Sequence, residues 1–182
     1  MPGAATIYLM VGLPGAGKTT MARRIAAATA AVRLTPDEWM APLFGHNDAD
    51  GKRDVLEGRM IAVAREVAAA GGSAILDFGC WSPEERYAIR AIAEGAGAAF
   101  ALHFDDVPEQ ERRRRADERW ATVPHETFEM TEPDHEAYLR VWRPPMADEL
   151  AYGPIPAPPE PFATWGAWAA DRWPGLAVLP TV

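Results

Sequence analysis

Residues 9–20 of the sequence read LMVGLPGAGKTT, and this stretch decides the fold. It continues the apolar run TIYLMV at 6–11, and seven of its twelve residues are Gly, Ala, Pro or Thr. Gly12, Gly17, Lys18 and Thr19 match the pattern of a phosphate-binding P-loop in full. Such a loop turns its backbone N–H groups inward around an anion, and the helix that follows directs its positive end at the same place. The stretch therefore predicts a buried strand, a phosphate-binding loop and a helix.

The P-loop pattern assigns a part in nucleotide binding to most residues of the loop. Lys18 reaches the β- and γ-phosphates, and the Thr19 hydroxyl is a ligand for Mg²⁺. Thr20 is included as a neighbour, without a phosphate role of its own. The alternative is a glycine-rich turn with an incidental Lys-Thr pair, and the strand before it and helix after it argue against that. The expected nucleotide-binding set is Gly12, Pro14, Gly15, Ala16, Gly17, Lys18, Thr19 and Thr20.

Composition narrows the class of protein. The chain has 182 residues, of which 48% are hydrophobic and 24% charged, as expected for one globular domain with a sizeable core. The net charge of −8 argues against a general nucleic-acid binder. The single cysteine, Cys80, excludes an internal disulfide and suits a reducing cytoplasm. Because the sequence has no basic leader and no apolar run near the roughly 20 residues of a membrane span, we expect a cytoplasmic protein.

Strand-like and helix-like segments alternate along the chain. Strands are expected at 6–11, 32–39, 73–78, 98–104 and 175–180. Helices are expected at 18–30, 52–70, 83–94, 108–120 and 134–143. Such alternation predicts an α/β protein of the P-loop NTPase fold, with a parallel sheet of about five strands and helices on both faces. We expect one P-loop domain over 1–150 with a small helical lid near 112–135, and a Pro- and Trp-rich extension over 151–182 packed on it.

Carboxylates follow the predicted strands, at the edge of the sheet where ligands bind in open α/β folds. Asp77 ends the run AILD, an arrangement that binds Mg²⁺ directly or through water. Asp37 follows Thr35-Pro36, and a carboxylate there can take the proton of an acceptor hydroxyl. Helix or turn capping is the alternative for both. For Asp105 and Asp106 we expect capping of the next helix rather than chemistry.

An arginine run, EQERRRRADERW at 109–120, provides the candidate lid. Most of its charges are expected to form solvated pairs with the acidic residues around them. Arg115 and Arg119 lie four residues apart on one helical face and lead into the irregular segment 121–133. We interpret these two as lid arginines that stabilise a transferred phosphoryl group, with Arg112 and Arg114 as weaker candidates. A nucleic-acid patch is the alternative, which the interleaved acids disfavour.

Four ordered motifs together resemble the AAA-type predicted P-loop kinases: GLPGAGKTTMARRIA, LTPDEW, AILDFGCWSPEER and FDDVPEQERRRRADERW. They also look like the kinase domain of phage polynucleotide kinase, with the zeta toxins and chloramphenicol phosphotransferase as more distant relatives. The resemblance covers residues 6–120 and, more loosely, extends to 150. It implies that Lys18 and Thr19 hold ATP phosphates and Mg²⁺ and that Asp37 activates the acceptor. It also implies that Asp77 lies near the phosphates or acceptor, with Arg115 and Arg119 in the lid.

The sequence departs from the polynucleotide kinase pattern around both aspartates. Pro36 and residues 38–40 stand where that pattern has arginines, and residues 78–81 replace polar side chains with Phe, Gly, Cys and Trp. Trp39, Phe78 and Trp81 favour a flatter, less charged acceptor. We therefore expect an ATP- and Mg²⁺-dependent phosphotransferase that acts on a small-molecule hydroxyl. The alternatives are a nucleic-acid 5′-hydroxyl kinase, which predicts a basic groove near Asp37, and an ATP-binding switch or partner-binding module.

Overall fold

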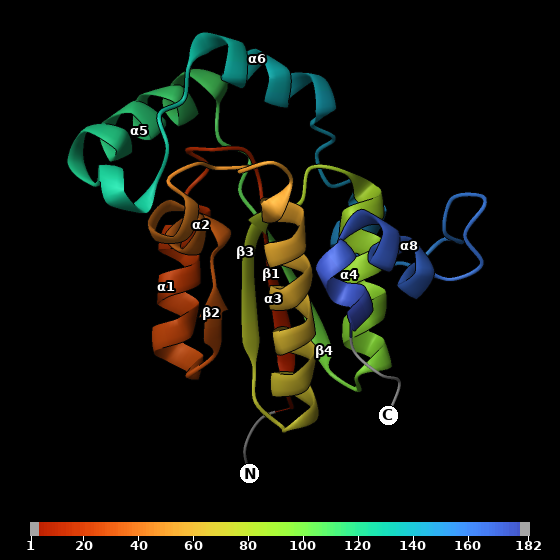
Figure 1. The fold of residues 1–182 in the computed structure, drawn as a ribbon. Coiled ribbons are helices and arrows are strands. Elements are labelled where there is room, and N and C mark those ends of the chain that lie inside the picture. Colours follow the sequence, from red (N-terminus) through yellow and green to blue (C-terminus); the bar gives the residue numbers. More distant parts are fainter. Residues whose placement is uncertain (1–3, 179–182) are drawn as a thin grey trace.

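A four-stranded parallel sheet forms the centre of the protein (Figure 1). The computed structural model describes residues 4–178. The strands lie in the order β2-β3-β1-β4. Their bounds are β1 (Thr6–Val11), β2 (Val32–Leu34), β3 (Ala74–Gly79) and β4 (Ala99–Phe104). The expected parallel α/β sheet is therefore present, and all its strands end at the same edge.

Helices cover both faces of the sheet and its carboxyl edge. α1 packs on one face, α3 and α4 pack on the other, and α8 packs on α4. Figure 1 shows α5 and α6 lying beyond the carboxyl ends of the strands. Within residues 4–178, the helices are too short or too polar to cross a membrane. The helical bounds are α1 (Lys18–Thr29), α2 (Pro36–Phe44), α3 (Lys52–Ala69), α4 (Pro83–Gly95), α5 (Glu109–Thr122), α6 (Glu132–Val141), α7 (Ala147–Leu150) and α8 (Trp165–Arg172), with 3₁₀ segments η1 (Pro124–Glu126) and η2 (Pro174–Val178).

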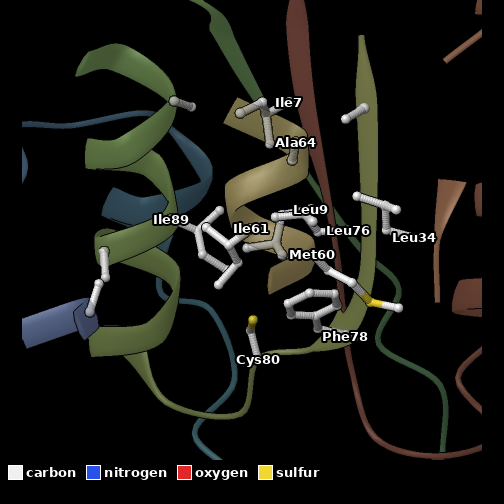
Figure 2. Close-up of a cluster of buried hydrophobic side chains, with 14 of the residues drawn as sticks. Ile7, Leu9, Leu34, Met60, Ile61, Ala64, Leu76, Phe78, Cys80 and Ile89 are labelled. Carbon is white, nitrogen blue, oxygen red and sulfur yellow. The ribbon is translucent and has the colours of Figure 1, made fainter. Parts of the chain in front are cut away.

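The core lies on both faces of the sheet because successive strand residues point to opposite sides. Leu9 and Leu76 belong to a large cluster with α3, α4 and α8, whereas Met10 and Ile75 join a smaller cluster under α1. Every residue of β3 is buried. This double burial explains why the strands are continuous apolar runs. Figure 2 shows the larger cluster, in which the labelled residues are Ile7, Leu9, Leu34, Met60, Ile61, Ala64, Leu76, Phe78, Cys80 and Ile89.

The sheet has four strands rather than about five, so the expected strand at 175–180 is wrong over its described part. Pro174–Val178 form η2, which packs on α3, and residues 179–180 lie outside the described residues. The exposed edge of β4 is contacted by a side chain instead: the Leu102 N–H donates to the Tyr152 hydroxyl at 3.1 Å. α8 and η2, which come from the Pro- and Trp-rich stretch, pack on α4 and α3 respectively. The domain boundary at residue 150 stays a prediction.

The second strand is shorter than the predicted 32–39. It ends at Leu34, and α2 begins at Pro36. The fixed φ of proline suits the first helical position, and the acids Asp37 and Glu38 are favourable in a first turn. Asp37 therefore lies in the first turn of a helix that the sequence did not predict, rather than at the end of a strand. The N-cap residue is Thr35, so Asp37 does not cap α2.

Candidate functional site

A cleft of about 1210 Å³ opens at the carboxyl edge of the sheet, between the P-loop and α5. P-loop residues 14–20, Asp37, Asp77, Arg115 and Arg119 all line it. Gly12 does not, and its N–H donates to the Gly79 carbonyl at 3.0 Å between β1 and β3. The structure thus brings together, in one cavity, every predicted catalytic and metal-binding residue.

α5 lies directly against the P-loop. Gly15 has a φ of +81°, and a Cβ atom there would be 1.9 Å from the Arg112 carbonyl oxygen, so only glycine fits this approach. Arg112 is buried and donates from its guanidinium to the Pro14 carbonyl at 3.3 Å. Its side chain therefore holds the backbone of the loop and is absent from the cleft lining. The N-cap of α5 is Pro108, so the expected capping by Asp105 or Asp106 is wrong.

Lys18 is held by the P-loop itself. Its ammonium group donates to the Leu13 carbonyl at 3.0 Å. Burial lowers the pKa of Lys18, and the carboxylates of Asp77 and Asp37 act in the opposite direction. The two carboxylates favour the charged ammonium form, and burial leaves little water to screen its attraction for a phosphate group.

Asp77 has one carboxylate oxygen without a partner. The residue is 5% exposed, and its Oδ2 accepts from the Thr35 hydroxyl at 3.3 Å. Within residues 4–178, Oδ1 is buried and receives no hydrogen bond. Burial raises the pKa of Asp77, while Lys18 and the nearby Thr19 hydroxyl oppose the rise. A buried, unpartnered carboxylate oxygen beside a P-loop hydroxyl fits Mg²⁺, which prefers oxygen ligands, so Thr19 and Asp77 are the residues that would hold the ion.

Asp37 is held by Arg53, a contact that the sequence did not predict. Asp37 Oδ1 accepts from the Arg53 guanidinium at 2.8 Å, and Arg53 Nε donates to Glu57 Oε1 at 2.9 Å. Burial opposes the charge of Arg53, but the two carboxylates outweigh it and raise the pKa of its guanidinium. Arg53 and Glu57 belong to α3, whose sequence shows only an amphipathic pattern. No local signal distinguishes them from a surface ion pair.

Aromatic and acidic side chains line the cleft on the Asp37 side. The rings of Trp81 and Tyr138 lie 4.4 Å apart between centroids, and Phe78 lines the same cavity. Trp39, which the sequence placed with them, is 47% exposed and is absent from the lining. We use the term acceptor side, after the acceptor hydroxyl expected from the sequence, for this part of the wall: Asp48, Asp54, Glu57, Phe78, Trp81, Glu85, Tyr138 and Arg172.

The two arginines predicted to belong to a lid, Arg115 and Arg119, differ in their partners. Arg115 lines the cleft, is 44% exposed, and donates from Nε to Glu111 at 2.7 Å. Arg119 also lines the cleft and donates to the Glu126 carbonyl at 3.2 Å. Arg114 is absent from the cleft lining and pairs with Glu111 and with Glu118, of which only Glu118 lines the cleft. Of the weaker candidates in the run, neither Arg112 nor Arg114 reaches the cleft.

Comparison with known proteins identifies the family and the fold. Residues 7–145 match the model of a family described as AAA domain. Among curated proteins, no match to the sequence was found. The fold is similar to that of Kti12 from Chaetomium thermophilum, solved in complex with ADP-AlF₃. The TM-score is 0.56 and the identity 20%, over 77% of this chain and 81% of that one.

A second solved structure extends the similarity over nearly the whole chain. It is a gluconokinase from Sinorhizobium meliloti 1021, with a TM-score of 0.54 and 16% identity, over 96% of this chain and 92% of that one. At such identities the two structures establish the fold alone. Together with the family match, they confirm the predicted P-loop kinase-like fold and its resemblance to the AAA-type P-loop proteins.

Proposed function

Because the chain belongs to the AAA-domain family and has a P-loop kinase-like, nucleotide-binding fold, we propose that it is an ATP- and Mg²⁺-dependent phosphotransferase acting on a small-molecule hydroxyl. The observation that carries the proposal is the position of Asp37. Its carboxylate lines the same cleft as the P-loop, Lys18 and Asp77, and Arg53 holds it there at 2.8 Å. A carboxylate held beside the P-loop can act as a general base on a hydroxyl bound in the same cleft.

In this mechanism the P-loop and Lys18 bind the phosphates of ATP. Bound Mg²⁺ would neutralise charge that develops on the phosphate oxygens. Thr19 and Asp77 would hold the ion, as the unpartnered Asp77 oxygen suggests. Lys18 would exchange its present bond to the Leu13 carbonyl for phosphate oxygens. These residues account for the nucleotide half of the reaction.

Asp37 acts on the acceptor in the other half of the reaction. Its carboxylate takes the proton from the acceptor hydroxyl while that oxygen attacks the γ-phosphorus. The bond from the γ-phosphorus to the bridging oxygen breaks, and ADP leaves with the electron pair. Arg115 and Arg119 stabilise the charge on the transferred group, after releasing Glu111 and the Glu126 carbonyl. The products are ADP and a phosphate ester.

The charges near Asp37 favour a small acceptor over a nucleic acid. A nucleic-acid kinase predicts free basic side chains here. Arg33 is paired with Glu38 at 2.7 Å, and Arg53 is shared between Asp37 and Glu57. Arg172 is likewise paired with Asp54 and Glu85. The phosphates of a nucleic-acid strand would contact arginines that are already paired and carboxylates that repel them.

The test is transfer of labelled γ-phosphate from Mg·ATP to a panel of nucleosides, amino-sugar and phenicol antibiotics, sugars and a 5′-hydroxyl oligonucleotide. We expect a labelled small molecule, and a loss of transfer of about 100-fold or more in Asp37→Asn with nucleotide affinity retained. Asp106→Asn is the control, because Asp106 is an exposed carboxylate outside the cleft lining.

Three outcomes would contradict the proposal. Full transfer by Asp37→Asn would exclude Asp37 as the base. A labelled oligonucleotide would establish the nucleic-acid kinase instead. Label released only as free phosphate, with the whole panel unmodified, would favour the ATP-binding switch.

A further inference from the structure

We infer that Glu57 and Trp173 are positioning residues for Asp37, acting through Arg53, so that the C-terminal part of the chain helps to build the acceptor side of the cleft. The inference rests on the proposed role of Asp37 as acceptor base. It gives a function to the Pro- and Trp-rich stretch, which the sequence left without one. The four residues Trp173, Glu57, Arg53 and Asp37 are called the positioning chain below.

Hydrogen bonds connect the positioning chain from end to end. Trp173 Nε1 donates to Glu57 Oε2 at 3.2 Å, and Arg53 Nε donates to Glu57 Oε1 at 2.9 Å. The Arg53 guanidinium then donates to Asp37 Oδ1 at 2.8 Å and to the Asn47 carbonyl at 3.2 Å. The two oxygens of Glu57 have different partners, so the plane of its carboxylate is fixed. Removal of either partner would let that carboxylate turn.

Burial along the positioning chain increases away from the cleft. Trp173 is 0% exposed and Glu57 is 7% exposed, whereas the side chains of Arg53 and Asp37 are 25% and 33% exposed. The inner end is therefore immobilised by core packing, and the outer end faces the cleft. An arginine that is held at both Nε and its terminal nitrogen loses the rotamer freedom it would have at a surface. Asp37 is in this way connected to the rigid core.

The backbone of the C-terminal segment is brought unusually close to α3. A Cβ atom at Gly175 would lie 2.0 Å from the Val55 carbonyl oxygen. A Cβ atom at Gly58, on the facing side, would lie 2.6 Å from the Leu176 nitrogen and 2.9 Å from the Trp173 carbonyl oxygen. The absence of side chains at these two positions lets Trp173 approach near enough for its indole to reach Glu57.

Core packing alone does not explain a glutamate at position 57. A buried carboxylate is costly unless it is paired, and an apolar residue of similar volume would pack there without that cost. Such a residue would, however, leave the buried indole N–H of Trp173 and the Nε–H of Arg53 without their acceptor, so the glutamate serves both partners at once. The neighbouring Arg172 supports the same interpretation, because it lines the cleft and pairs with Asp54 at 2.7 Å and with Glu85 at 2.9 Å. Two adjacent residues of the C-terminal segment therefore contact the acceptor side.

The consequence for Asp37 is a fixed orientation. Arg53 occupies Oδ1, and among the described residues Oδ2 has no hydrogen-bond donor. Oδ2 is thus left for the acceptor hydroxyl. If Glu57 no longer held Arg53 Nε, the guanidinium could bind both oxygens of Asp37 and block the base.

The experiment compares Glu57→Gln and Trp173→Phe with the control Trp165→Phe. Trp165 belongs to the same buried cluster, but its indole donates to the Pro156 carbonyl at 2.8 Å and not to a cleft residue. Two quantities are measured: transfer kinetics with the acceptor identified above, and hydrogen exchange of the Arg53 Nε–H by NMR. Nucleotide affinity and unfolding curves show which variants are folded.

If the inference is right, Glu57→Gln and Trp173→Phe lower kcat for transfer about tenfold or more, because a displaced base loses its alignment. The KM for the acceptor changes little, Arg53 Nε–H exchange is faster in both variants, and Trp165→Phe resembles the wild type. Equal effects of Trp173→Phe and Trp165→Phe on both measurements would reduce Trp173 to a packing residue and overturn the inference. If the wild type transfers phosphate to no acceptor, the proposed function fails. The positioning chain has its own test: it is refuted if exchange of the Arg53 Nε–H is the same in Glu57→Gln and Trp173→Phe as in the wild type.

Discussion

The folded protein disfavours the charged form of the Glu57 side chain. Burial raises the pKa of its carboxyl to about 7, from 4.5, against the opposing effect of Arg53 and Arg172. Glu85, on α4, adds to the rise, and the indole N–H of Trp173 works against it. In the unfolded chain the group would titrate near 4.5. The native state therefore binds a proton at Glu57 more tightly than the unfolded state does.

This difference predicts a pH-dependent contribution to stability. The contribution is fully present below pH 4.5 and is lost as the pH rises to about 7, since only the native state holds the proton in that range. The wild type should therefore lose about 3 kcal/mol of unfolding free energy, relative to Glu57→Gln, over this interval. Urea unfolding of both proteins at several pH values measures it. Glu66→Gln, which alters an exposed glutamate of α3, is the control, and a constant difference between wild type and Glu57→Gln would contradict the prediction.

Functional residues can be predicted from the sequence where they belong to a motif of neighbouring residues. They are missed where they come together only in the folded protein. Lys18 and Thr19 follow from one motif, because the chemistry of phosphate binding needs adjacent residues. Glu57 and Trp173 are 116 residues apart, and neither lies in a recognisable pattern. Only the packing of η2 on α3 brings them together, and that depends on the tertiary fold.

At the scale of elements, a buried ion pair attaches the segment after α6 to the rest of the fold. Arg86 of α4 is 1% exposed and binds Glu149 of α7 with two hydrogen bonds, at 2.6 and 2.7 Å. Arg86 also donates to the carbonyls of Cys80 and Arg143, at 3.2 and 2.9 Å. One guanidinium thus joins α4, the end of β3 and the connection from α6.

Breaking this pair should destabilise the protein strongly. Glu149→Ala leaves the Arg86 charge buried without its partner, which costs about 3–5 kcal/mol. The exposed glutamate pairs of α5 offer a comparison: Glu118→Ala should cost well under about 1 kcal/mol, because Arg114 and Glu118 are both solvated. Denaturant midpoints measure both. Similar midpoints for the two variants would show that Arg86 finds other partners or water when Glu149 is removed.

The type of an element could be predicted from the sequence where its hydrophobic periodicity and its length indicate the same kind of structure. The helix predicted at 52–70 is α3, and the capping signal at Ser82 is present, with Ser82 accepting from the Glu85 N–H at 3.2 Å. Two predictions were wrong because a short apolar run fits more than one structure. VRLTPDEW contains both a strand and the start of α2, and GLAV packs on α3 as a 3₁₀ segment.

At the scale of the whole molecule, the cleft has two sides of different origin. The nucleotide side comes from the P-loop, β3 and α5. The acceptor side comes from α3, α4, α6 and α8, with Phe78 of β3 and the loop residues Asp48 and Trp81. A ligand that binds the native cleft stabilises the fold by mass action. The nucleotide alone should therefore raise the melting temperature, whatever the acceptor.

We predict that Mg·ATP at about 100 times its Kd adds about 2.7 kcal/mol, which raises the melting temperature by about 5–10 °C. Lys18→Ala should abolish the shift, because it removes the cation that we propose to bind the phosphates. The sequence has one other lysine, Lys52, which is exposed and absent from the cleft lining. Lys52→Ala should keep the full shift in differential scanning fluorimetry, and an equal loss in both variants would place nucleotide binding outside the P-loop.

The late position of Trp173 has a consequence for synthesis on the ribosome. Lys18, Thr19 and Asp77 all belong to the first 80 residues, so the groups that we propose to bind Mg·ATP are made early. Trp173 is translated 116 residues after Glu57, a delay of about 6–23 s at ordinary elongation rates. In the later part of that interval, once α5 has been made, a nascent chain can carry a complete phosphate-binding loop while Glu57 still lacks its indole partner. Nucleotide binding should therefore appear on ribosome-bound chains before the acceptor side is assembled.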